Sequence, residues 1–303
     1  MDDTRTLHLA DGRDLGYAVR GDPDGTPLLH FHGALSSRWE GAIYHTAARA
    51  AGLRLISVDR PGIGASSPYP GRTVQAFAKD VAALLAHLSI RDAGVMGVSG
   101  GTVYALACAH ALPAAIHSVT VLVGCADVTE PAVQEVLAPA ARRVFGVIGS
   151  AWSPLRAMLG VAALAMHAPG ARRAARPWLR LLAAASGLAP ADRQALEHPR
   201  FLELVERLPA AALRAPYAGM GAGVAEDMRL LMRPWTFPLG RIAQPVHLWY
   251  GTDDRVAPVA MGEHLARRLP RASMHVVPGQ GHISMLIEGI ADVLGNPPAR
   301  QLA

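Results

Sequence analysis

The sequence contains a single lysine, Lys79, and only two cysteines, Cys108 and Cys125, among its 303 residues. Two cysteines are too few for a disulfide scaffold, so we expect two reduced and mostly buried thiols. No apolar stretch reaches the ~20 residues of a membrane-spanning helix, because Arg, Pro, Gly or Asp interrupts each one. The N-terminal stretch MDDTRTLHLADGRD is acidic and polar, unlike a signal peptide. We therefore expect a cytoplasmic, globular protein with no membrane partner.

Positive charge comes almost entirely from arginine, and the formal net charge is only +5. The arginines are spread along the chain, without the aromatic interleaving of a nucleic-acid-binding surface. This pattern is typical of a solvated face and argues against a nucleic-acid partner. With 51% hydrophobic residues, a chain of this length can bury a large core, and the composition leaves open whether it is a monomer or a homodimer.

Short apolar runs alternate with helical patterns at both ends of the chain. The expected strands cover residues 26–33, 53–62, 93–99, 116–124, 244–251 and 272–279. The expected helices cover residues 73–88, 101–112, 256–269 and 284–294. Alternation of this kind predicts an α/β fold, with a mostly parallel central sheet and helices on both faces.

Strand patterns are absent from residues 125–239, where Ala, Leu and Arg dominate. A helix start is expected at Thr129-Glu130-Pro131, where a capping hydroxyl precedes a proline that suits the first turn. We therefore predict three segments: a first core segment over 1–124, an inserted helical block over 125–239, and a second core segment over 240–303.

One serine, Ser99, lies between Gly97 and Gly101 in the stretch GVMGVSGGTVYALACA, where a predicted strand gives way to a predicted helix. Small neighbours let the two backbones pass closely at such a turn, which holds the serine hydroxyl out at the carboxyl end of the sheet. The following helix directs its first amide groups and the positive end of its dipole toward the same point, which favours an oxyanion there. The stretch therefore predicts a nucleophilic serine.

A nucleophilic serine needs a base and an orienting carboxylate, because a free hydroxyl is a poor nucleophile at neutral pH. His282 lies in PGQGHISM, directly after the last predicted strand, where its imidazole can reach the carboxyl end of the sheet. Three carboxylates also follow predicted strands: Asp253 and Asp254 in YGTDDRVAP, and Asp127 after the strand that ends at residue 124. The residues alone leave the choice among these three open.

Taken together, these motifs resemble those of the α/β-hydrolase family, and the resemblance covers nearly all of both core segments. HFHGALSSR resembles the oxyanion loop of the family, DRPGIGASS its Asp-x-x-Gly-x-Gly-x-Ser turn, GVSGG its nucleophile elbow, YGTDDRVAP its acid loop and GQGH its histidine loop. The resemblance implies the α/β-hydrolase fold, with the insertion forming an all-helical cap over the site.

The resemblance also selects the acid. In the acid loop of the family, the carboxylate usually stands three residues after a glycine and about four before a proline, so Gly251 and Pro258 point to Asp254. Asp253 is then expected to shape the loop, and Asp127 to cap the start of a helix in the insertion. The implied catalytic triad consists of Ser99, Asp254 and His282.

Two backbone amides, those of Ala34 and Gly100, are implied as the oxyanion hole. His30 and His32 alternate along one strand end, but no third ligand cluster lies nearby in the sequence, so we expect them to shape this loop by hydrogen bonding. We predict no metal and no cofactor. The turn that holds Asp59, Arg60 and Ser66 is structural in the family and is expected to be so here.

The implied reaction is cleavage of an ester, lactone or thioester of a small, largely apolar substrate through an acyl-enzyme. The cap segment, 125–239, is expected to select the substrate, with Met158 and Trp178 as candidates for its pocket-facing residues. A serine at the elbow argues against dehalogenases and epoxide hydrolases, which use aspartate there. Carbon–carbon bond hydrolases, haloperoxidase-like members and hydroxynitrile lyases use the same triad and stay open as alternatives, as does a non-catalytic binding protein on this fold.

Overall fold

The structure, a computed structural model, describes residues 4–150, 189–202 and 222–295. One eight-stranded sheet crosses the molecule in the order β1-β2-β4-β3-β5-β6-β7-β8. The strands are β1 (Arg5–His8), β2 (Asp14–Gly21), β3 (Thr26–Phe31), β4 (Leu53–Val58), β5 (Ala93–Val98), β6 (Ile116–Leu122), β7 (Val246–Gly251) and β8 (Ala272–Val277). Pairing is antiparallel from β1 to β2 and from β2 to β4, and parallel between all other neighbours. The predicted mostly parallel sheet is confirmed.

The six strands predicted from apolar runs are all present, and the longer predictions overran into the loops that follow. In β5 and β6 nearly every residue is buried, because helices cover both faces of the sheet, and this explains their largely apolar sequences. The β1–β2 hairpin at the edge was not predicted. The side chains of β1 are mostly exposed, so its sequence carries no apolar run.

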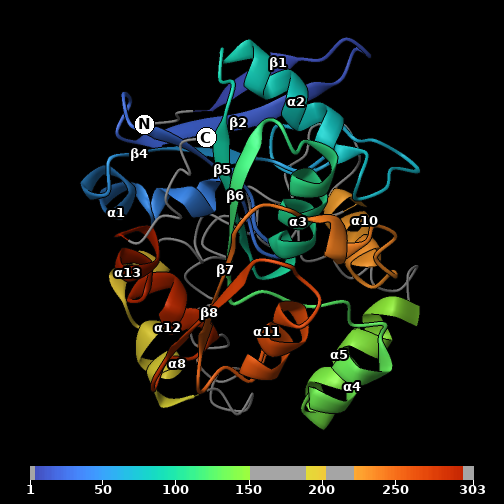
Figure 1. Cartoon of the computed structure of the whole chain (residues 1–303), viewed down its shortest axis with the longest axis vertical. Coiled ribbons are helices and arrows are strands. Elements are labelled where there is room, and N and C mark those ends of the chain that lie inside the picture. The colour runs from blue at the N-terminus through green and yellow to red at the C-terminus, as the bar shows by residue number, and fades with distance from the viewer. Residues whose placement is uncertain (1–3, 151–188, 203–221, 296–303) are drawn as a thin grey trace, which may run out of the picture.

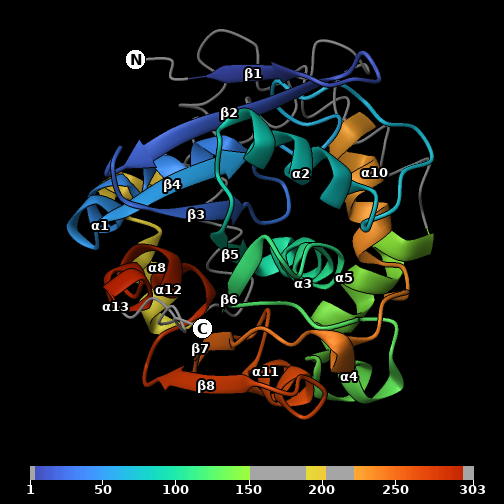
Figure 2. The ribbon, with the colours of Figure 1, turned by 45° about the horizontal axis from the view of Figure 1, so that its top comes forward.

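Helices cover the two faces of the sheet, as Figures 1 and 2 show. Helices α2 (Phe77–His87), α3 (Thr102–Ala111) and α11 (Val259–Ala266) share one apolar core with the sheet. Helices α1 (His45–Ala50), α12 (His282–Ile287) and α13 (Ile290–Gly295) share a second core with the opposite face. The single helix expected over 284–294 is thus two short helices, and the first of them begins at the histidine of the GQGH loop.

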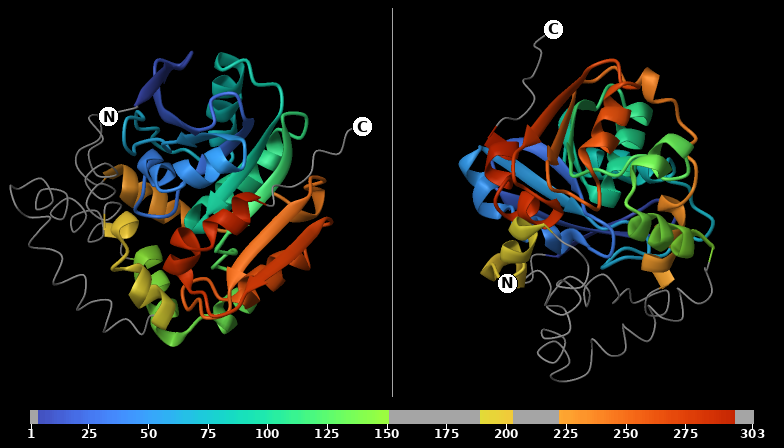
Figure 3. Two further views of the ribbon diagram at one scale, coloured as in Figure 1. Left: turned by 90° about the vertical axis from the view of Figure 1, so that its left-hand side faces the viewer. Right: turned by 90° about the horizontal axis from the view of Figure 1, so that it is seen from below.

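Short 3-10 helices η1 (Arg38–Ala42), η2 (Ser99–Gly101) and η3 (Leu239–Arg241) complete the core segments. Between β6 and β7, the described residues form helices and loops: α4 (Pro131–Val136), α5 (Pro139–Ser150), α8 (Pro190–Ala195) and α10 (Ala222–Leu231). Helix α8 lies beside α12 in both views of Figure 3. The boundaries at 125 and 239 stay a prediction, and the candidate cap residues Met158 and Trp178 lie outside the described residues.

The start of the insertion differs from the expectation in one detail. Helix α4 begins at Pro131, as predicted, but no side chain caps its first turn. The Asp127 carboxylate instead accepts hydrogen bonds from the amide and hydroxyl of Thr129, at 2.9 and 2.6 Å, and from the amide of Trp235, at 2.7 Å. Asp127 therefore joins the two ends of the insertion and does not cap the helix.

A search of the described residues finds no helix that is both long enough and apolar enough to cross a membrane.

Candidate active site

Ser99 lies in the turn between β5 and α3, in a strained backbone conformation. Its φ of 48° is in the left-handed region, which residues with a side chain adopt rarely. The two flanking glycines permit the turn. A Cβ on Gly97 would lie 2.7 Å from the carbonyl oxygen of Gly101, and a Cβ on Gly101 would lie 2.1 Å from that of Phe31. Only glycine fits at these two positions. The close packing that they allow fixes the turn that carries the Ser99 hydroxyl.

The structure brings three sequence-predicted residues into one hydrogen-bonded chain. The Nε2 atom of His282 lies 3.1 Å from Oγ of Ser99, and its Nδ1 atom lies 2.8 Å from Oδ2 of Asp254. A carboxylate can only accept, so Nδ1 donates to Asp254 and Nε2 is left to accept the Ser99 proton. The Asp254 side chain is fully buried, and its Oδ1 atom accepts the amides of Val256 and Ala257, each at 2.8 Å.

The surroundings of His282 favour its protonated form. Burial opposes the positive charge, but the carboxylate of Asp254, together with those of Asp192 and Glu40, outweighs this cost and raises the pKa of His282 above its ordinary value. The same carboxylates would stabilise an imidazolium formed during proton transfer.

The two rival carboxylates do not contact His282. Asp253 is exposed in the loop after β7, where its Oδ1 atom accepts from the Thr252 hydroxyl at 2.8 Å. Asp127 is held by Thr129 and Trp235, as described above. Asp254 is therefore the one of the three that the fold directs to the imidazole.

Ala34 and Gly100 lie next to each other beside Ser99. A Cβ on Gly100 would lie 3.3 Å from the Ala34 amide nitrogen, and both residues line the cavity at Ser99. The loop before Ala34 is braced by Glu40, whose buried carboxylate accepts from the Gly33 amide at 3.1 Å and from Nε2 of His30 at 3.0 Å.

The turn after β4, which was expected only to be a structural turn, also supports the loop before Ala34. The Arg60 guanidinium donates to the carbonyl oxygens of His32 and Gly33. Ser66 donates to the carbonyl oxygen of Asp59 at 2.9 Å. His32 is fully buried, and burial lowers its pKa well below the ordinary value. Among the described residues, no group of three or more metal-ligating side chains gathers.

A buried carboxylate on α10, Asp227, was missed by the sequence analysis. It accepts from Arg60 Nη2 at 2.7 Å, from Arg72 Nη2 at 3.0 Å and from the Tyr104 hydroxyl at 2.7 Å. Burial opposes its ionisation, but the two guanidinium groups outweigh that cost and hold the pKa of Asp227 well below its usual range. No local motif marks this residue, because its partners lie far away in the sequence.

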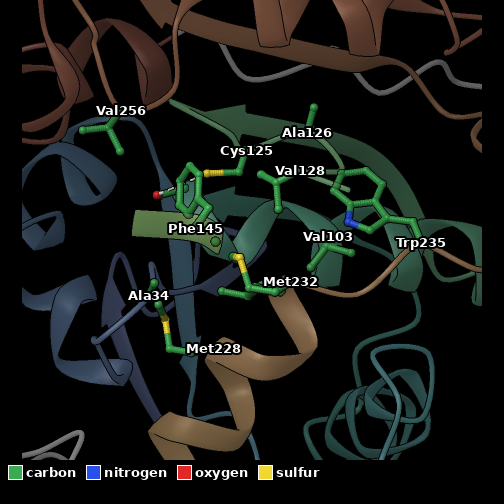
Figure 4. Close-up of a pocket in the computed structure, with 13 residues that line it drawn as sticks. Ala34, Val103, Cys125, Ala126, Val128, Phe145, Met228, Met232, Trp235 and Val256 are labelled. Carbon is green, nitrogen blue, oxygen red and sulfur yellow. Dashed lines mark hydrogen bonds between the residues drawn. The ribbon is translucent and has the colours of Figure 1, made fainter. Parts of the chain in front are cut away.

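An apolar cavity of about 110 Å³ opens at Ser99 (Figure 4). Its walls come from the loops after β3, β5, β6 and β7 and from helices α3, α5 and α10. The lining residues are Ala34, Ser99, Gly100, Val103, Cys125, Ala126, Val128, Phe145, Met228, Leu231, Met232, Trp235 and Val256. Within this lining no side chain carries a charge, so the cavity suits an apolar group.

Cys125 lines the same cavity, and its Sγ atom lies 4.0 Å from Oγ of Ser99 (Figure 4). Both cysteines are free thiols, and Cys108 is buried in α3. Burial raises the pKa of Cys125 to about 11, so the thiol stays protonated at neutral pH and is a poor nucleophile.

Comparison with known proteins identifies this chain with one fold. A family model described as the alpha/beta hydrolase fold matches residues 26–144. An uncharacterised hydrolase of Bacillus subtilis (strain 168) is 33% identical over 110 residues, which is 36% of this chain and 38% of that protein. A non-heme chloroperoxidase of Streptomyces lividans is 33% identical over 99 residues, 32% of this chain and 35% of that protein. The chain thus matches little more than a third of the length of these relatives.

The whole described fold resembles solved structures. A hydrolase from Pseudomonas aeruginosa PA01 superposes with a TM-score of 0.67, at 22% identity, over 96% of both chains. At this level of identity the likeness establishes the fold, including the second core segment that the family model does not reach.

The buried position of Asp227 predicts an acid-sensitive contribution to stability. Because its pKa is depressed in the folded protein, its stabilising effect is present above about pH 4, the unfolded value, and is lost as the pH falls below it. Asp227→Ala should lower the free energy of unfolding by about 3–5 kcal/mol at neutral pH, since it leaves Arg60 and Arg72 buried without their carboxylate. Urea unfolding measured between pH 2 and 7 would show both effects.

Asp24, exposed in the turn between β2 and β3, provides the matched control. Asp24→Ala should leave stability and its acid dependence nearly unchanged. Equal stability losses for the two variants would show that the hydrogen bonds of Asp227 to Arg60, Arg72 and Tyr104 add no stability beyond that of an exposed aspartate.

Proposed function

We propose that this chain, a member of the α/β-hydrolase family, is a serine hydrolase that cleaves an ester-type bond of a small, largely apolar substrate. The hydrogen-bonded chain from Ser99 through His282 to Asp254 carries the proposal. It supplies a nucleophile, a base and an orienting acid in the geometry that acyl transfer needs. The ester-type bond is that of an ester, a lactone or a thioester.

In the first half of the proposed reaction, Oγ of Ser99 attacks the substrate carbonyl carbon while Nε2 of His282 takes the hydroxyl proton. The Asp254 carboxylate holds the imidazolium through Nδ1. The carbonyl oxygen becomes an oxyanion, which the amides of Ala34 and Gly100 stabilise. The tetrahedral intermediate collapses, His282 gives its proton to the leaving oxygen or sulfur, and the acyl group remains on Ser99.

In the second half, water repeats these steps. His282 takes a proton from water as the water oxygen attacks the acyl carbon, and the same two amides hold the second oxyanion. Return of the proton to Ser99 releases the carboxylic acid and restores the enzyme. Neither half requires a metal or a cofactor.

The cavity supports an apolar acyl group. Its volume of about 110 Å³ is below the ~150 Å³ of an engineered apolar cavity that binds benzene. A short acyl chain therefore fits this space better than a long one. Helices α5 and α10 of the insertion contribute Phe145, Met228 and Leu231 to the walls, which supports the proposal that the 125–239 segment caps the site and selects the substrate.

One alternative has a specific source. The match to a protein named a non-heme chloroperoxidase favours a haloperoxidase-like activity, which would use the same serine, histidine and aspartate. The two functions differ in the acceptor of the acyl group, since hydrolysis uses water and the alternative uses hydrogen peroxide. Assays of one substrate panel with and without peroxide and bromide separate them.

The first test concerns Ser99. A fluorophosphonate probe should label it at neutral pH, and a panel of p-nitrophenyl esters, lactones and thioesters should reveal turnover. Ser99→Ala should abolish labelling and lower kcat by ~10⁴-fold or more, because the nucleophile is lost. Mass spectrometry locates the adduct. An adduct on another residue, or a Ser99→Ala protein that retains most of its activity, would contradict the proposal and favour a non-catalytic binding protein.

The second test separates the neighbouring carboxylates. Asp254→Asn should lower kcat by ~10⁴-fold with little change in structure, because an amide cannot hold the same histidine tautomer. Asp253→Asn is the matched control, since that side chain is exposed and bonded to Thr252, and it should keep nearly full activity. Circular dichroism checks the fold of both variants. A larger loss in Asp253→Asn than in Asp254→Asn would mean that the proposed acid is misassigned.

The third test concerns acyl length. A Cβ on Gly100 would lie 2.8 Å from Cδ1 of Leu231, so this leucine closes the cavity beside the nucleophile turn. Leu231→Ala should raise kcat/KM for hexanoate over acetate esters, by roughly fourfold for each additional buried methylene, or ~0.8 kcal/mol. Leu230→Ala, the same change one residue earlier and outside this cavity, is the control. An unchanged preference in Leu231→Ala would mean that the acyl group binds elsewhere.

A further inference from the structure

We infer that Asp192, on helix α8 of the insertion, is a positioning residue for His282, so that the insertion aligns the proposed base as well as lining the cavity. The inference rests on the proposed function. Asp192 lies 90 residues away from His282 in the sequence, and the residue is only 1% exposed. Nothing in the motif pattern of the sequence marks it.

The Asp192 carboxylate accepts four hydrogen bonds, all from the segment that carries His282. Its Oδ2 atom accepts from the His282 amide at 3.0 Å. Its Oδ1 atom accepts from the amides of Ile283 and Ser284, at 2.8 and 2.9 Å, and from the Ser284 hydroxyl at 3.2 Å. The three amides are the first of α12, and such amides have no acceptor within their own helix. One buried side chain thus fixes the backbone from which the imidazole projects.

The loop before His282 leaves space for this carboxylate. Gly281 precedes the histidine, and a Cβ at this position would lie 2.4 Å from Cγ of Asp192. Its φ of −106° is accessible to any residue, so the backbone conformation does not require glycine here. The close approach of the Asp192 carboxylate does. The glycine of the GQGH loop is therefore explained by its contact with α8.

Asp192 acts on His282 through charge as well as position. The titratable groups that act on the imidazole are Asp254, Asp192 and Glu40, and all three raise its pKa. Asp254 is bonded to the ring, whereas Asp192 is bonded to the backbone of the same residue. Loss of the Asp192 charge should therefore lower the pKa of His282 while the ring keeps its bond to Asp254.

The experiment compares wild type with Asp192→Asn. The amide is isosteric, but its NH₂ group cannot accept, so either the His282 amide or the three donors on Oδ1 lose their acceptor. We expect kcat on a p-nitrophenyl ester to fall by roughly 10- to 100-fold with KM nearly unchanged, as for a small misplacement of a reacting group. The acid limb of kcat/KM, and the His282 titration followed by NMR, should both move to lower pH. Gln194→Ala, exposed on the same helix, is the control.

A merely structural role would lower the melting temperature and leave the folded enzyme with wild-type kcat and an unmoved His282 titration. If either the fall in kcat or the shift of the titration is absent from folded Asp192→Asn, the inference is wrong. Wild-type protein that neither turns over any ester nor labels at Ser99 would instead refute the proposed function itself, and these two failures are distinguishable.

A second variant tests the inference if Asp192→Asn does not fold. Gly281→Ala keeps the carboxylate but places a methyl group against it, so kcat should again fall by at least tenfold. In the double variant Asp192→Ala/Gly281→Ala the clash is relieved, and its kcat should match that of Asp192→Ala alone. Additive losses in the double variant, or full activity in Gly281→Ala, would overturn the inference.

Discussion

Parallel strands end at the same edge of a sheet, and everything at the candidate site depends on this constraint. Ser99, Asp254 and His282 follow β5, β7 and β8, so loops distant in the sequence meet within hydrogen-bond distance. The close packing of β5 against α3 through two glycines then fixes the serine in its strained turn. Precision at this edge comes from backbone packing, which a polar side chain alone could not supply.

Buried carboxylates extend this arrangement outward. Glu40 braces the loop before Ala34, Asp227 holds the arginine that donates to the same loop, and Asp192 holds the backbone of His282. Asp227 and Asp192 come from helices of the insertion. Asp227 binds Arg60 in the loop after β4, and Asp192 binds the first turn of α12. A carboxylate suits this task because its two oxygens accept several bonds at once, and leaving any of those buried donors unpaired is costly.

Local patterns predicted the elements better than their ends. The strands β3 to β8 were recognised from their apolar runs. The β1–β2 hairpin was missed, since β1 is mostly exposed and β2, though mostly buried, has its apolar residues interrupted by Gly16 and Arg20. The break between α12 and α13 and the partners of Asp127 were also missed. The capping proposed for Asp127 was wrong, because its carboxylate accepts from Thr129 and from the remote Trp235 amide and not from the first turn of α4.

The sequence by itself determined the sheet-and-helix order, the serine turn and the histidine loop, because each rests on residues adjacent in the chain. It determined the acid only with the help of a family resemblance, since Asp253 and Asp254 are equivalent as a local pattern. Tertiary structure alone decided that Asp254 faces the imidazole, that Asp227 pairs with two buried arginines and that Asp192 holds the histidine backbone. Contacts such as these depend on how distant segments pack, and hydrogen-bond partners that lie 28, 90 or 167 residues apart leave no trace in local spacing.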